Sequence, residues 1–328
     1  MGTTNPRILM QTTFRIRRLN PETEHPTPYF QEYHLDLEHS DSILDGLIKI
    51  RETLDDSLAL RCSCRGAICG SCGMRINGHA ALACKTKVIA MAEEGKPIQV
   101  EPMNNMPVIK DLVTDMGSFW EKIRQVQPWL QPQGPIPQAE FIAPAEAMSH
   151  LSGVMSCIMC GVCVSDCTVL EVDKKFVGPA ALAKAYRFVA DPRDGQTQQR
   201  LESLNEPGGM WDCTRCMECI QVCPKDVDPM DRIMSLRTKG MAAEVPSTCG
   251  SRHAEVFTDI VREKGQLDEP MLALRTFGIQ YIGRLVGMIP LIIQSVLHGK
   301  VPVSGPLHRP IPGIHHIRRL FSRREKSS

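Results

Sequence analysis

The chain has 328 residues, a length that predicts two domains with an extension. Apolar residues make up 42%, enough for ordinary globular cores, and the net charge of +1 excludes a general electrostatic attraction to nucleic acid. Any electrostatic preference for a partner must therefore come from a local patch.

Residues 12–110 predict a small α/β domain. Alternating apolar residues, bounded by turn signals, predict strands over the segments 14–19, 30–37, 74–76, 80–83 and 98–101. The Asn77-Gly78 pair joins the third and fourth of these as a hairpin, and the last segment is expected to end the sheet. Ser42 is placed to cap a helix with an apolar face formed by Ile43, Leu44, Leu47 and Ile48.

Residues 111–144 are expected to form a bridge and then a linker. The second half of this segment holds five prolines, which disfavour helix both in themselves and in the residues before them. Residues 145–240 predict a helical domain, in which one helix begins at Gly178-Pro179 and another at Pro229.

Residues 241–328 carry no metal motif and predict an extension that docks to a partner or a membrane. Helices are expected over about 252–264 and 270–297, followed by a proline-rich basic tail. Gly278 to Leu297 is the most apolar stretch, but its polar interruptions argue against an ordinary bilayer-spanning helix. An apolar helix beside a basic tail fits an anionic membrane, and docking on a partner subunit is the equal alternative.

Fourteen cysteines stand out in the composition, and 13 of them fall into three tight groups. A secreted disulfide framework is disfavoured because Met1 to Arg7 lacks the apolar core of a signal peptide. The cysteines are also two or three residues apart, as in metal sites. We therefore expect reduced thiols in the cytoplasm.

The first group is Cys64-x4-Cys69-x2-Cys72, followed by Cys84. This is the plant-type spacing for a [2Fe–2S] cluster, in which one loop supplies three thiolates. Interleaved glycines are expected to turn backbone N–H groups toward the sulfurs. A structural zinc site is the alternative, since zinc also binds four cysteines. Cys62 lies outside the pattern and is expected to be a spare thiol.

The second and third groups each follow the bacterial pattern C-x2-C-x2-C-x3-C and form an approximate internal repeat. In two-cluster ferredoxins the fourth cysteine of each run ligates the other cluster. One [4Fe–4S] cluster is therefore assigned to Cys157, Cys160, Cys163 and Cys223. The other is assigned to Cys167, Cys213, Cys216 and Cys219. Cys249 stands alone and is expected to be an unligated loop thiol.

Three clusters on one chain predict an electron relay without a substrate site of its own. No G-x-G-x-x-G or Walker loop is present in the sequence, and no His/Asp/Ser constellation stands out. We expect no catalytic residue on this chain, and the reactions at both ends of the relay are expected to occur on partner subunits.

The segments Cys64–Met74, Ile76–Gly78 and Leu82–Cys84 resemble the [2Fe–2S] signature of succinate dehydrogenase/fumarate reductase iron–sulfur subunits. Met106–Met116 resembles the bridge segment of that family. The resemblance covers about residues 12–240. It implies an α+β fold, with an N-terminal β-grasp plant-type ferredoxin domain followed by an α-helical two-cluster ferredoxin domain.

The family resemblance also implies partners and a place in the cell. A FAD-containing flavoprotein subunit would oxidise succinate or reduce fumarate, and electrons would pass between it and a membrane quinone. The chain would lie peripherally on the cytoplasmic face of the inner membrane, beside a membrane-anchor subunit.

This sequence departs from the common family pattern at three positions. Cys216 fills a place that is not cysteine in members with a [3Fe–4S] cluster, so a fourth iron has a ligand. Thr168 and Thr214 replace residues that are associated with quinone binding in the common type. The pattern is similar to a variant branch whose partner carries cysteine-rich CCG domains, and an electron-transfer subunit of a heterodisulfide-reductase-like complex is the alternative function.

Overall fold

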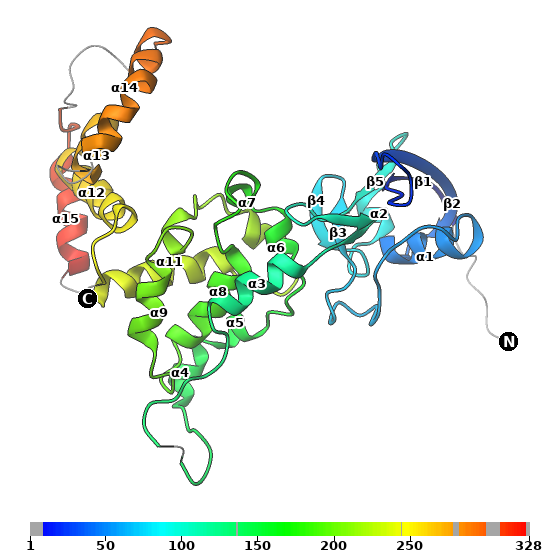
Figure 1. The fold of residues 1–328 in the computed structure, drawn as a ribbon, viewed down its shortest axis with the longest axis horizontal. Coiled ribbons are helices and arrows are strands. Elements are labelled where there is room, and N and C mark those ends of the chain that lie inside the picture. Colours follow the sequence, from blue (N-terminus) through cyan, green and yellow to red (C-terminus); the bar gives the residue numbers. More distant parts are fainter. Residues whose placement is uncertain (1–8, 136, 244, 278–281, 300–308, 326–328) are drawn as a thin grey trace. The chain divides into compact units, whose positions relative to one another are not determined.

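The computed structural model describes residues 9–135, 137–243, 245–277, 282–299 and 309–325 (Figure 1). Contacts between residues divide the chain into two units, Met1–Ala243 and Glu244–Ser328. The first unit begins with a mixed sheet and continues with helices, which confirms the predicted α+β class. The finer domain boundaries, at 12–110 and 145–240, stay a prediction.

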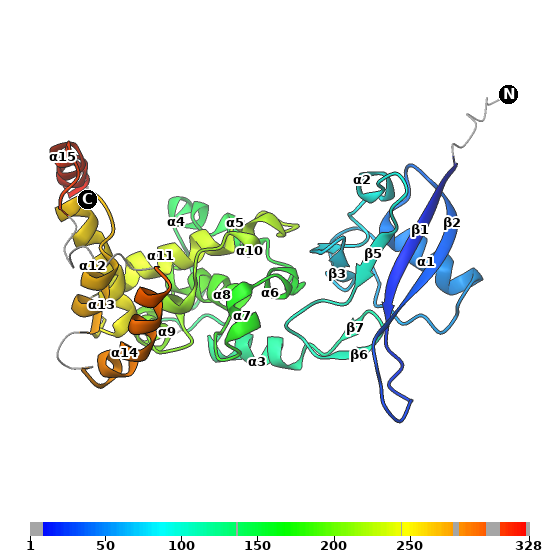
Figure 2. The same cartoon turned by 90° about the horizontal axis from the view of Figure 1, so that it is seen from above.

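The sheet has five strands in the order β2-β1-β5-β3-β4 (Figure 2). The strands are β1 (Leu9–Arg18), β2 (Tyr29–Glu38), β3 (Gly73–Ile76), β4 (His79–Leu82) and β5 (Ile98–Glu101). Strand β1 pairs antiparallel with β2 and parallel with β5, and β5 pairs antiparallel with β3. This mixed order, with one helix packed on the sheet, is the β-grasp arrangement that the family resemblance implies.

Helix α1 (Ile43–Thr53) covers the sheet with the face that its sequence predicts. Ser42 caps the helix, because its hydroxyl accepts from the Asp45 N–H while the Asp45 carboxylate accepts from the Ser42 N–H. Leu47 and Phe14 are fully buried where the helix meets the sheet. Burial of these side chains supplies the main stabilisation of the domain.

Strand β5 is the last strand along the chain to join the five-stranded sheet, as expected, but it is followed by a second, two-stranded sheet that was not predicted. Its strands are β6 (Val108–Lys110) and β7 (Val113–Thr114), which are too short to show an alternating pattern. Asp111, between them, accepts from the Arg18 guanidinium at 3.0 Å and from the Ala59 N–H at 2.8 Å. The buried carboxylate thereby fixes the bridge segment to the β-grasp domain.

Short helices make up the rest of the first unit. They are α2 (Val88–Met91), α3 (Gly117–Gln125), α4 (Ala145–Ser149), α5 (Ser152–Met155), α6 (Val162–Ser165), α7 (Thr168–Val172), α8 (Pro179–Val189), α9 (Thr197–Leu204), η1 (Met210–Asp212), α10 (Glu218–Gln221) and α11 (Pro229–Ala242). The predicted starts at Pro179 and Pro229 are confirmed, and α8 packs against α11 at the centre of the helical part. Helix α3 lies in the bridge and was not predicted.

The proline-rich linker contains no helix or strand in its described residues, as expected. Arg200, almost fully buried, donates to the carbonyl oxygens of Gln127 and Trp129 at 2.7 and 2.9 Å. Its guanidinium also pairs with Asp194 at 3.0 Å. These bonds hold the start of the linker against the helical part of the unit.

The second unit contains α12 (Cys249–Lys264), α13 (Glu269–Phe277), α14 (Ile282–Leu297) and α15 (Ile314–Glu325). Helix α12 packs against α13 and α15. The single helix predicted over 270–297 is represented by α13 and α14, and residues 278–281 lie outside the described part. The predicted basic tail contains a helix that was not predicted, α15, in which Ile314, Ile317 and Phe321 form an apolar stripe at helical spacing. No described helix is long and apolar enough to cross a membrane.

Candidate iron–sulfur cluster sites

The first cysteine loop runs between α1 and β3 and directs backbone N–H groups at sulfur atoms. The Cys64 sulfur accepts from the N–H groups of Gly66 and Cys69 at 3.3 and 3.2 Å, and the Cys84 sulfur accepts from Ala67 at 3.3 Å. Charge on thiolate sulfur is stabilised by such donors, and hydrogen bonds to the sulfurs tune the potential of a bound cluster. The loop therefore fits the four-thiolate, two-iron group that its spacing predicts.

Two non-glycine residues of this loop have left-handed backbone conformations. Arg65 and Ala67 have φ values of 52° and 54°, in the left-handed region that side chains disfavour, and Gly70 has φ 72°. Gly66 and Gly73 are not among the residues with positive φ, so of the three glycines only Gly70 uses a left-handed backbone conformation. Alternating backbone conformations of this kind make an N–H-lined concavity that suits an anionic cluster.

The thiols of this loop differ in environment. Cys72 is 3% exposed, and burial raises the pKa of its thiol to about 12. Cys69 is exposed, and hydrogen bonds from the Ser71 hydroxyl and the Cys64 N–H lower the pKa of its thiol to about 6. The loop is therefore buried on the Cys72 side and exposed to solvent on the Cys69 side.

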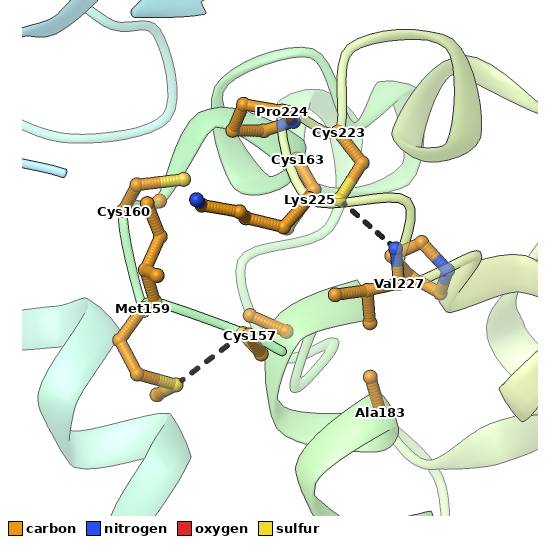
Figure 3. A pocket seen from close by; sticks show the side chains of 13 residues that line it. Cys157, Met159, Cys160, Cys163, Ala183, Cys223, Pro224, Lys225 and Val227 are labelled. Atoms are coloured by element: carbon orange, nitrogen blue, oxygen red, sulfur yellow. Dashed lines mark hydrogen bonds between the residues drawn. The ribbon is translucent and has the colours of Figure 1, made fainter. Parts of the chain in front are cut away.

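A pocket in the helical part is lined by four cysteines from two different runs (Figure 3). Its walls carry Cys157, Cys160 and Cys163 of the second run together with Cys223 of the third. This is the set that the crossed pattern assigns to the first [4Fe–4S] cluster. The Val227 N–H donates to the Cys223 sulfur at 3.4 Å, and Lys225 extends into the same pocket (Figure 3).

Burial is the largest influence on the pKa values of the thiols in this pocket. It raises the pKa of the Cys160 thiol to about 11 and that of Cys163 well above its ordinary value. The neighbouring thiols add to both shifts, since thiolate charges close together repel one another. Cationic iron offsets that repulsion and deprotonates a coordinating thiol, so the pocket suits a metal–sulfide group better than four free thiols.

The remaining four cysteines form a second neighbourhood. Burial raises the pKa of the Cys219 thiol to about 12, and nearby Cys213, Cys216 and Cys167 raise it further. Burial likewise raises the pKa of Cys167, with added repulsion from Cys216 and Cys213. The fourth cysteine of the second run therefore lies beside the third run, as the crossed assignment requires.

The second and third runs have the same backbone conformation around their middle cysteine. The residue before the middle cysteine has a positive φ in both runs, 56° at Met159 and 61° at Arg215. The residue after it does too, 79° at Gly161 and 72° at Met217, and each directly precedes a short helix, α6 or α10. Cys216 therefore occupies the same place in its loop as Cys160 does in the other.

Close packing joins the first loop to the second run. A Cβ atom placed on Gly70 would lie 2.7 Å from the Cys160 Cβ and 2.9 Å from its Cα, so only glycine allows this approach. Lys85, which follows Cys84, donates to the carbonyl oxygen of Pro224, which follows Cys223, at 3.0 Å. The two thiol-lined sites are thus adjacent, and polar and van der Waals contacts hold them together.

Two cysteines lie outside these sets. Cys62 is half-buried beside the first loop, and Cys249 begins α12 in the second unit. In the described residues, no three His, Cys, Asp or Glu side chains converge tightly enough to hold a single metal ion.

A β-grasp domain with a plant-type cysteine loop, joined to helices with two interleaved cysteine runs, defines a multicluster iron–sulfur electron carrier. The 2Fe-2S iron-sulfur cluster binding domain family matches residues 13–121, and the 4Fe-4S dicluster domain family matches residues 153–227. The "succinate dehydrogenase iron-sulfur subunit" of Coxiella burnetii is 37% identical over 230 residues, which are 69% of this chain and 96% of that protein. The "fumarate reductase iron-sulfur subunit" of Mycobacterium tuberculosis is 41% identical over 229 residues, covering 69% and 90% respectively.

The chain therefore belongs to the succinate dehydrogenase/fumarate reductase iron–sulfur subunit family. Its function as the electron-transfer subunit of an oxidoreductase complex, predicted from the cysteine pattern and the resemblance, is confirmed. A chain of the Mycobacterium smegmatis Sdh1 complex in the apo form shares the fold, with a TM-score of 0.66 and 24% identity. The match covers 72% of this chain and 98% of that one.

Proposed function

We propose that the chain carries one [2Fe–2S] and two [4Fe–4S] clusters. Cys64, Cys69, Cys72 and Cys84 would hold the first; Cys157, Cys160, Cys163 and Cys223 the second; and Cys167, Cys213, Cys216 and Cys219 the third. When bound, each cluster supplies a one-electron redox centre. The matching φ values around Cys160 and Cys216 support a four-thiolate third site, because Cys216 takes the position of an assigned ligand.

The single observation that carries the relay function is the Gly70–Cys160 contact. It brings the loop of the proposed [2Fe–2S] site against the backbone of the first proposed [4Fe–4S] site. The third set is tied to the second by the crossed cysteines and by the packing of α6 on α10. Three centres in this order would let single electrons cross the first unit.

Exposure supports exchange of electrons at both ends. Cys64 and Cys69 are exposed in the first loop, and Cys216 is exposed in the third run. The four cysteines of the middle site are half-buried, and none of them is exposed. A relay with an exposed thiol at each end is suited to one partner at each end.

We assign the flavoprotein subunit with FAD to the [2Fe–2S] end. A membrane-anchor or CCG-domain subunit would meet the third-run end, with quinone as the indirect partner. Thr168 and Thr214 are exposed near that end. Neither offers the residue type that the common family uses for quinone, so the quinone site would belong to the partner. The chain would lie on the cytoplasmic face of the inner membrane as a peripheral subunit.

Metal analysis and electron paramagnetic resonance with redox titration, on the purified complex, test this function. We expect about ten iron atoms per chain and signals from one [2Fe–2S] and two [4Fe–4S] centres. Zinc without iron or acid-labile sulfide would refute the relay. A native [3Fe–4S] signal would refute the four-ligand third site. Reduction of a dithiol acceptor in place of quinone would favour the heterodisulfide-reductase-like alternative.

A further inference from the structure

Helix α14 of the second unit is apolar and uncovered on every side over part of its length. All six residues from Ile289 to Gln294 are exposed, and six successive residues at 100° each point to all sides of a helix. Large apolar side chains with 47–80% exposure are Val286, Ile289, Leu291, Ile292, Ile293 and Leu297. A helix with apolar residues on all sides is ordinarily buried. We therefore expect a membrane or another molecule to cover this one.

The rest of the second unit has its own core. Ile260 of α12 is fully buried, and Leu272 of α13 is 8% exposed. Helix α15 contributes Phe321, whose ring lies 5.0 Å from the Arg262 guanidinium carbon. Arg318 of α15 also donates to the Glu263 carbonyl oxygen at 3.0 Å. This packing gives α15 a fixed orientation, with Arg319 and Arg323 on its exposed side.

Charge over residues 270–324 is of one sign. The sequence has no Asp or Glu between Pro270 and Arg324, although it has eight Lys or Arg residues there. Residues 270–328 carry a net charge of +8, whereas residues 1–269 carry −7. The nearly neutral chain therefore has a strongly basic end, and the exposed apolar helix lies in it.

We propose that the second unit binds the surface of an anionic lipid bilayer. Side chains of α14 would enter the boundary between headgroups and acyl chains, and Arg319 and Arg323 would face lipid phosphates. A bilayer surface offers an apolar layer and negative charge side by side, which matches both observations. A second copy of the chain is disfavoured as the occupant, because two basic surfaces would repel.

This inference extends the proposed function by naming the element that touches the membrane, and its test needs no electron transfer. The full chain with its clusters is floated with vesicles of phosphatidylcholine, alone or mixed with phosphatidylglycerol. We expect binding to the mixed vesicles, weakened by added salt. Iron and sulfide contents of each variant are measured separately, so that a failure of the cluster assignment is distinguished from a failure of lipid binding.

The double substitution Ile292→Asp/Ile293→Asp tests the apolar contact. Both side chains are about half exposed, so the substitutions leave no cavity. We expect vesicle affinity to fall at least tenfold, since carboxylates must be desolvated at the interface. The matched control is Ile142→Asp/Val172→Asp in the first unit, where both side chains are more than 80% exposed. The control should bind like the unmodified chain.

The double substitution Arg319→Gln/Arg323→Gln tests the charge. Affinity for the mixed vesicles should fall about tenfold, whereas any binding to pure phosphatidylcholine should not change. The proposal is overturned if the unmodified chain does not float with mixed vesicles, or if the α14 variant and its control bind equally. Self-association without vesicles that Ile292→Asp/Ile293→Asp abolishes would also overturn it, and would identify a second copy as the occupant.

Discussion

Asn105 donates its side-chain amide to the carbonyl oxygen of Cys167 at 3.1 Å. The same amide reaches the carbonyl oxygens of Val164 and Ser165 at 2.9 and 3.2 Å. A residue just before the bridge strands therefore holds the segment that ends in a proposed ligand of the third-run site. Asn105 has φ 62°, a conformation that asparagine tolerates better than most residues.

Asn105→Gly should loosen the third-run site and leave the others intact. Glycine keeps the positive φ but removes the amide, at a cost of about 1–2 kcal/mol in unfolding free energy. Loss of third-run iron to a chelator should become faster, which time-resolved absorbance and paramagnetic resonance can follow. Asn77→Gly is the control, because Asn77 also has a positive φ and donates to one carbonyl, away from the helical part. Equal lability in both variants would contradict the role of Asn105.

Cys216→Ser should alter the third-run site alone. Three thiolates would remain there, so either a [3Fe–4S] signal appears or that cluster is lost, while the other two signals persist. Quantitative resonance spectra and iron content measure the outcome. Cys62→Ser and Cys249→Ser should leave iron content unchanged, since neither thiol lies in the three sets. Unchanged iron and spectra in Cys216→Ser would refute its assignment.

Gly70→Ala should separate the first loop from the second run. The new Cβ would be 2.7 Å from the Cys160 Cβ, and positive φ adds strain of about 1–2 kcal/mol. Electron transfer between the first two centres should slow, as measured by rapid-freeze spectroscopy after reduction of the flavoprotein end.

Gly78→Ala separates the effect of strain from that of the clash. Gly78 also has a positive φ, 87°, but nothing lies within 4 Å of a Cβ placed there. We expect it to lose stability without slowing the transfer. If Gly78→Ala slows transfer as much as Gly70→Ala does, contact with Cys160 is not the route.

Arg237→Gln should lower the reduction potential of the third-run site. The Arg237 guanidinium is almost fully buried and donates to the carbonyl oxygens of Met210 at 2.8 Å and Cys213 at 2.7 Å. A permanent cation favours the more negative, reduced form of a nearby cluster. We expect a shift on the order of tens of millivolts in a redox titration. Arg237→Lys keeps the charge and should restore most of the potential; an equal shift in both variants would point to structural disturbance instead.

Local patterns were enough to predict much of the fold. The Ser42 cap, the Asn77-Gly78 hairpin and the helix starts at Pro179 and Pro229 each depend on residues close together in sequence. The β6–β7 sheet was missed because strands of two or three residues have no readable period. Helix α15 was missed because flanking prolines and basic residues concealed an apolar stripe that packing on α12 stabilises.

The cysteine sets were predicted from spacing, but the shape of the loops was not. Arg65, Ala67, Met159, Arg215 and Met217 all have positive φ, although none is a residue type that favours it. Tertiary contacts must compensate for this strain, and no local sequence signal reports them. The Gly70–Cys160 approach was equally hidden, since it joins residues 90 positions apart.

The pocket shared by Cys157, Cys160, Cys163 and Cys223 has a consequence for biosynthesis. The first loop has all its cysteines once residue 84 has been made, whereas this pocket lacks its last thiol until residue 223 leaves the ribosome. The proposed ligand set of the two-iron loop is thus complete first. Nascent chains that stall between residues 163 and 223 would hold three of the pocket's thiols without the fourth, so the proposed ligand set of this pocket is incomplete until residue 223 has been made.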